Sequence, residues 1–162
     1  MRILGIDPGT RITGWGVIEP YGPRARVLDA GVIRASTKKP LEYRLRQIGK
    51  GLEEVLAAHT PTCVAVEDIF YAKHANAALK LGHARGVALY IAARADLEVH
   101  AYPPALVKRT VTGRGRADKD QVARLVGAIL NLKELPPIDA TDALAIAITH
   151  LQASRSAFKR SS

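Results

Sequence analysis

Four acidic residues stand where their carboxylates could act together in one site. Asp7 ends an apolar stretch near the start of the chain and is followed by Pro-Gly, a strong turn signal. Glu67 ends a second apolar run, and Asp139 and Asp142 are three residues apart at the start of a predicted helix. Because the catalytic groups of open α/β sheets gather at the carboxyl ends of strands, we expect these carboxylates to be neighbours.

Such a group of carboxylates has a definite chemical use. Four carboxylates without a cationic partner repel one another and retain protons, unless hard divalent cations occupy the site. We therefore expect Mg²⁺, with Mn²⁺ as its substitute, and two ions in one site. Two bridged ions can activate water, position a scissile phosphate and stabilise the leaving oxygen, so no covalent protein nucleophile is required. The acids thus predict phosphodiester hydrolysis.

Each acid also has a purely structural interpretation. Asp7 before Pro-Gly is an ordinary turn residue, and Glu67 at a strand end can simply be solvated. Asp139 and Asp142 suit an N-cap and a third-position acid that stabilise a helix N-terminus. A shared site accounts for all four residues at once, and that favours the catalytic interpretation.

Basic and aromatic residues near these acids suggest a nucleic-acid partner. A glycine-containing stretch from 108 to 119 can approach a phosphate backbone closely and has a single acid, Asp118. Phe70 follows Glu67 in a predicted surface loop, where it either stacks on a nucleobase or anchors the loop in the core. The basic residues of this predicted DNA-binding surface are Lys108, Arg109, Arg114, Arg116 and Lys119.

Composition agrees with a polyanionic partner. The 162 residues include 24 Lys plus Arg against 15 Asp plus Glu, a net charge of +9, which either attracts nucleic acid or serves solubility alone. With 48% hydrophobic residues the chain can bury a core, so we expect one domain over 1–153 and a flexible basic, Ser-rich tail over 154–162. The single cysteine excludes a disulfide framework and a cysteine zinc site. We expect a cytoplasmic protein that neither is exported nor contacts a membrane, since no apolar run approaches spanning length.

Hydrophobic periodicity and turn signals predict the elements that position these residues. Three strands come first and suggest an antiparallel meander, and the later alternation of strand and helix suggests parallel pairing. We therefore predict an α/β fold with a mixed five-stranded sheet and helices on both faces. The predicted strands are 2–7, 14–19, 26–34, 63–66 and 97–102, and the predicted helices are about 40–59, 73–95, 105–111, 118–130 and 139–152.

Five segments together form a recognisable set: GIDPGTRITGWG (5–16), VED with Phe70 (66–70), NAALKLGHARG (76–86), VKRTVTGRGRADKDQV (107–122) and DATDALAIAITH (139–150). With these segments the sequence closely resembles the RuvC endonucleases, which resolve Holliday junctions and have a ribonuclease H-like fold. The resemblance implies that Asp7, Glu67, Asp139 and Asp142 are the catalytic metal ligands. It also implies that Lys108 and Lys119 act at the scissile phosphate and that Phe70 stacks at the junction.

The resemblance further implies a homodimer, partnered by RuvA and RuvB, that nicks two opposed strands of like polarity and leaves 5′-phosphate and 3′-hydroxyl ends. A two-fold symmetric dimer suits a four-way junction, which is itself approximately two-fold symmetric. The alternative is a non-catalytic, junction-binding architectural protein whose acids only cap helices and turns. The turn after Asp7 faintly resembles the phosphate loops of actin-like ATPases, but one domain is too short for their two lobes.

Overall fold

The protein is built on one five-stranded sheet with the strand order β3-β2-β1-β4-β5. The computed structural model describes residues 1–68 and 75–161. Strand β1 pairs antiparallel with β2 and parallel with β4, while β2 pairs antiparallel with β3 and β4 parallel with β5. The predicted mixed sheet and its opening meander are confirmed. The strands are β1 (Ile3–Asp7), β2 (Ile12–Tyr21), β3 (Arg24–Arg34), β4 (Cys63–Glu67) and β5 (Glu98–Tyr102).

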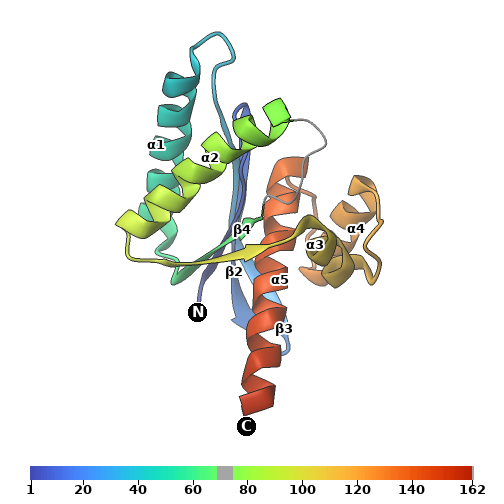
Figure 1. The fold of residues 1–162 in the computed structure, drawn as a ribbon. Coiled ribbons are helices and arrows are strands. Elements are labelled where there is room, and N and C mark those ends of the chain that lie inside the picture. Colours follow the sequence, from blue (N-terminus) through green and yellow to red (C-terminus); the bar gives the residue numbers. More distant parts are fainter. Residues whose placement is uncertain (69–74, 162) are drawn as a thin grey trace.

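Helices cover both faces of the sheet, as predicted (Figure 1). One core lies between the sheet and helices α1 and α2, and a second core lies between the sheet and α3, α4 and α5. Within the described ranges, no helix is both long enough and apolar enough to cross a membrane. The helices are α1 (Leu41–His59), α2 (Ala75–Arg94), α3 (Pro104–Thr112), α4 (Lys119–Ile129) and α5 (Ile138–Ser161).

Burial on both faces of the sheet explains why the central strands are apolar at every position. In β1 the side chains of Ile3, Leu4 and Ile6 are almost completely buried. Because side chains alternate along a strand, Ile3 enters the core under α5, whereas Leu4 and Ile6 enter the core under α1 and α2. A strand covered on both faces needs apolar residues at every position, so the first polar residue, Asp7, marks the point where β1 leaves the core.

Helix α5 is longer than its sequence pattern suggests. We expect it to end near Gln152, but it continues to Ser161. The guanidinium of Arg155, on this added part, donates hydrogen bonds of 2.8 to 3.0 Å to the carbonyl oxygens of Gly22, Pro23 and Arg24. These bonds tie the helix to the β2–β3 hairpin, a contact between distant parts of the chain that periodicity does not reveal.

Candidate active site

The ends of β1 and β4 bring the first two predicted acids to the same edge of the sheet. The strands are parallel neighbours in register from Ile3 opposite Cys63 to Ile6 opposite Val66. Asp7 and Glu67 are the last residues of their strands and follow the final matched pair. The sequence-based prediction that these two side chains are neighbours is therefore correct in its geometry.

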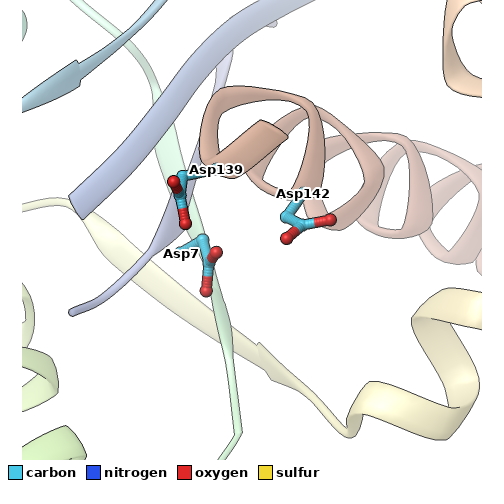
Figure 2. A group of neighbouring side chains, drawn as sticks. All are labelled: Asp7, Asp139 and Asp142. Atoms are coloured by element: carbon cyan, nitrogen blue, oxygen red, sulfur yellow. The ribbon is translucent and has the colours of Figure 1, made fainter. Parts of the chain in front are cut away.

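The first turns of α5 supply the other two acids. One carboxylate oxygen from each of Asp7, Asp139 and Asp142 lies within 4.8 Å of the others, a group that could hold a metal ion. Figure 2 shows these three side chains around a common space, with Asp139 and Asp142 on the helix. Asp139 is not an N-cap, because α5 already begins at Ile138. Glu67 lies outside this group of three but lines the same pocket as Asp7 and Asp142.

Glycines on β1 and β2 allow α5 to come this close to the sheet. A Cβ atom on Gly14 would lie 1.9 Å from the carbonyl oxygen of Asp139, and one on Gly5 would lie 2.0 Å from that of Ala143. Gly14 pairs with Asp7 in the sheet, so the glycine opposite one acid makes room for the helix that carries another. This role of Gly14 was not predicted from the sequence. The sequence signal that could have revealed this role is the spacing of Gly14 and Gly16, which places both glycines on one face of β2.

Burial and mutual repulsion make this site unfavourable for negative charge. Burial raises the pKa of Asp7 to about 8, and the nearby Glu67, Asp142 and Asp139 add to that rise while Lys119 opposes it. Burial also raises the pKa of Glu67 and of Asp142. A polypeptide that concentrates carboxylates in this way gains from a bound cation, and oxygen-only donors match hard divalent ions.

Two predicted lysines lie at the same pocket. Lys108 on α3 and Lys119 on α4 line a cavity of about 230 Å³ together with three of the acids. The Nζ of Lys119 donates a hydrogen bond to Oδ2 of Asp142 at 3.3 Å. The negative charge of Asp142 raises the pKa of Lys119 above its ordinary value, so this ammonium stays protonated at neutral pH.

The remaining predicted DNA-binding residues lie outside this cavity. Arg109 is exposed on α3, and Arg114 and Arg116 are exposed in the loop between α3 and α4. Phe70 falls outside the described residues, so its predicted stacking stays a prediction.

Arg85 on α2 is a positioning residue for the end of β4. Its Nε donates a hydrogen bond of 3.0 Å to the carbonyl oxygen of Glu67. Its guanidinium also contacts the carboxylate of Asp68 at 3.3 Å. Arg85 therefore fixes the end of β4 from which the Glu67 side chain enters the pocket.

The sheet order and the placement of the acids define a class of protein. A mixed five-stranded sheet with helices on both faces and carboxylates at the ends of β1 and β4 and at the start of α5 is the architecture of ribonuclease H-like enzymes. The family model described as crossover junction endodeoxyribonuclease RuvC matches residues 3–150. The chain belongs to the RuvC family.

Individual relatives agree with this membership. The chain is 55% identical to the RuvC of Syntrophotalea carbinolica over 150 residues, which cover 93% of each protein. It is 51% identical to the RuvC of Sorangium cellulosum over 154 residues, which cover 95% of this chain and 86% of the relative. The structure of T. thermophilus RuvC in complex with a Holliday junction substrate superposes with a TM-score of 0.89 at 40% identity, covering 97% of this chain and 96% of that one.

These comparisons confirm three of the sequence-based predictions: the family, the fold class and the crossover junction endodeoxyribonuclease activity. They disfavour the alternative of a non-catalytic architectural protein, because the relatives are named as nucleases.

Proposed function

We propose that this chain resolves four-way DNA junctions by paired, symmetric nicks in two opposed strands of like polarity, leaving 5′-phosphate and 3′-hydroxyl ends. The observation that carries the proposal is the convergence of Asp7, Asp139 and Asp142 from two separate elements onto one space, with Glu67 on the same pocket. Capping and turn roles do not account for this convergence, because those roles are satisfied locally along the chain.

Two Mg²⁺ ions, or Mn²⁺ in their place, are the cofactors of this proposal. Asp7, Glu67, Asp139 and Asp142 would hold them, since hard cations prefer oxygen ligands and the four side chains offer only carboxylates. When bound, such ions activate water and stabilise the charge that develops on a phosphodiester during in-line displacement. The raised pKa of Asp7 means that metal binding also displaces a proton at neutral pH.

The two lysines of the pocket act on the phosphate by charge. Lys119 lies beside Asp142 in this pocket, so its ammonium can donate hydrogen bonds to a phosphate oxygen. Lys108 faces the same cavity from α3 and adds a second positive charge beside the scissile group. Arg85 supports the site indirectly, because it holds the backbone carbonyl of Glu67.

A homodimer places two such sites on one junction. A two-fold axis relates the opposed strands of a junction, so an isologous dimer presents one active site to each of them. Leu79 and Tyr90 on α2 are more than 60% exposed and are 11 residues apart, which puts them on the same face of that helix. This apolar face supports dimer formation through α2.

The biological setting is part of the same proposal. Junction DNA is the substrate, in keeping with the junction complex of the T. thermophilus relative. RuvA and RuvB are the proposed branch-migration partners, and the activity belongs to recombination and repair in the cytoplasm. Arg109 on α3 and Arg114 and Arg116 in the loop that follows it, with Lys108 and Lys119, contact the DNA backbone.

A nicking assay tests the activity and its mechanism together. A labelled synthetic four-way junction and a linear duplex of matched sequence are incubated with the protein in Mg²⁺, Mn²⁺ or chelator. The wild type should make symmetric nicks in the junction only, and only with metal. Asp7→Asn should lower the rate by on the order of a thousandfold or more, about 4 kcal/mol of transition-state stabilisation, while junction binding persists.

Three results would contradict the proposal. Nicks in chelator would show that the acids do not act through metal. Normal cleavage by Asp7→Asn would remove the carboxylate site from the mechanism. Equal cleavage of the linear duplex would show a nuclease without selectivity for junctions. Ligation of the cut arms checks the 5′-phosphate and 3′-hydroxyl ends.

A further inference from the structure

Helix α4 borders a second depression on the side away from the acids. This groove has a volume of about 660 Å³ and lies between the end of α3, the loop that follows it and the outer face of α4. Among its lining residues, all within the described ranges, there are three arginines and no acid. We call it the arginine groove, and its polar lining residues are Thr112, Arg114, Arg116, Gln121 and Arg124.

The backbone around the arginine groove is fixed by local hydrogen bonds. The Thr112 hydroxyl lies 2.7 Å from the carbonyl oxygens of both Lys108 and Arg114 and accepts a hydrogen bond of 3.1 Å from the Arg114 N–H. Gly113, between them, has a φ of +75°, a left-handed conformation that glycine adopts without strain. Arg114 is therefore presented from a defined turn at the end of α3.

The α4 side of the arginine groove is equally well defined. Asp118 accepts a hydrogen bond of 2.8 Å from the Gln121 N–H, while the Gln121 side chain accepts one of 3.2 Å from the Asp118 N–H, which makes a capping box. Arg124 follows one turn later, and its Nε donates to the Asp120 carbonyl at 3.3 Å. These contacts hold the start of α4 and keep the Arg124 guanidinium beside its own helix.

The same two helices form the wall of the catalytic pocket. Lys108 on α3 and Lys119 and Val122 on α4 line the pocket, whereas Thr112, Gln121 and Arg124 line the groove. Positive charge thus continues across the α3–α4 pair from the acids to its outer side. A DNA strand with one phosphate in the pocket would therefore meet a basic surface at its neighbouring phosphates.

We propose that the arginine groove binds the sugar-phosphate backbone of a junction arm away from the scissile phosphate, and that Arg124 is a positioning residue of this second site. The inference rests on the proposed function. Guanidinium groups bind phosphate oxygens in a bidentate manner, and exposed ones do so without a large desolvation cost. Thr112 and Gln121 offer neutral polar groups to the same backbone. Arg124 was absent from the predicted DNA-binding residues, because it is separated from the basic loop in the sequence.

Binding measurements at several salt concentrations test the groove directly. The affinity for a labelled four-way junction is measured in chelator from about 50 to 200 mM salt for the wild type, for Arg124→Gln and for the triple variant Arg114→Gln/Arg116→Gln/Arg124→Gln. The slope of log binding constant against log salt concentration is negative. Each lost phosphate contact should make it less steep by about 0.9 and weaken binding about five- to tenfold. Arg46→Gln, an equal change of charge on α1 across the sheet, is the matched control and should leave the slope unchanged.

Steady-state nicking separates positioning from chemistry. In Mg²⁺, Arg124→Gln should raise KM in proportion to the lost affinity and leave kcat within about twofold, because the groove holds an arm and not the reacting phosphate. Arg124→Lys should recover part of the affinity, since it restores charge without the bidentate geometry. Circular dichroism melting checks that each variant folds.

The inference fails if Arg124→Gln and the triple variant match Arg46→Gln in both salt slope and KM. It also fails if kcat falls while KM stays constant. Unchanged junction affinity would instead favour an acidic protein surface as the occupant of the groove. The nicking assay on the wild type tests the proposed function separately. A wild type that binds junctions without cutting them would overturn the proposed function, and the salt slopes would still show whether the arginine groove binds DNA.

Discussion

Carboxylates have opposite electrostatic surroundings at the two ends of the sheet. At the hairpin end, Glu19 accepts a hydrogen bond from Arg26 and lies near Arg2, and the bond from Arg26 lowers the pKa of Glu19. At the carboxyl edge, burial and neighbouring acids raise the pKa of Asp7 to about 8. A carboxylate at the hairpin end is therefore paired with arginines, whereas the carboxylates at the carboxyl edge are clustered without an equivalent amount of positive charge.

This difference separates stability from function within one domain. The hairpin end also has Arg155, whose guanidinium satisfies three backbone carbonyls of the turn. The carboxyl edge has Lys119, which compensates only part of the carboxylate charge. Sites with strongly perturbed ionisation are typical of catalytic centres, because they are built for a bound group and not for the free chain. Four predictions test this separation.

Among these four predictions, the largest effect is expected from Gly14→Ala. The added methyl group would lie 1.9 Å from the carbonyl oxygen of Asp139, so α5 must move away from β2. We expect nicking to fall by on the order of a hundredfold or more, because small displacements of catalytic groups have effects of that size. Overpacking should also lower the free energy of unfolding by about 1 to 3 kcal/mol, measured by urea denaturation.

Gly115→Ala is the matched control for this prediction. A Cβ atom there meets its nearest neighbour, the carbonyl oxygen of Ala105, at an ordinary 3.9 Å. It should change the free energy of unfolding little, so it controls for the steric effect of an added methyl group. If Gly14→Ala behaved like Gly115→Ala, the close approach of α5 would not be what assembles the acids.

Lys119→Gln should have the next largest effect. Removing a positive charge beside the scissile phosphate should reduce kcat by about ten- to a hundredfold, toward the low end of losses for a preorganised electrostatic donor because this side chain is largely exposed. Lys119 also lowers the pKa of Asp142, so the pH profile of the variant should shift to higher pH. The profile is measured in single-turnover nicking. Lys119→Arg should preserve the profile, and a shift of equal size in that variant would contradict the role of charge.

The site illustrates what the sequence does and does not reveal. Asp7 and Glu67 were predictable because a strand buried on both faces must be apolar throughout, so its first acid marks its end. The approach of α5 was not predictable, because it depends on glycines in β1 and β2 that face a helix more than 120 residues later. The role of Arg85 was not predictable for the same reason, since its partner is a backbone carbonyl on another element.

The length of α5 was also not predictable from the sequence pattern alone. Its last turns lack a strong apolar repeat and are held by Arg155 at the hairpin, so local periodicity ended the predicted helix too early. Tertiary contacts of this kind override local pattern in setting where a helix ends. Residues 108–119 were recognised by their positive charge, their glycines and the family resemblance. None of these showed that Lys119 and Arg124 on α4 line different depressions.

The pH dependence of stability should report Asp7 directly. Its folded pKa of about 8 lies above its ordinary 3.8, so the folded state binds this proton more tightly. The associated stability is fully present below about pH 4 and is lost as the pH rises toward 8. Metal-free wild type should therefore lose melting temperature between pH 6 and 8.5 relative to Asp7→Asn, as scanning calorimetry can measure. Mg²⁺ should raise the melting temperature more at pH 8.5, because protons compete less with metal.

The smallest effect is expected from Glu19→Gln at the opposite end of the sheet. Exposed ion pairs contribute little to stability, so the melting temperature at pH 7 should fall only slightly and nicking should not change. Because the pKa of Glu19 is lowered, its contribution is present above its ordinary 4.5 and is lost as the pH falls. The variant and the wild type should therefore converge in melting temperature in acid, the opposite direction to Asp7. A loss of nicking in Glu19→Gln comparable to that in Lys119→Gln would contradict the functional separation of the two ends of the sheet.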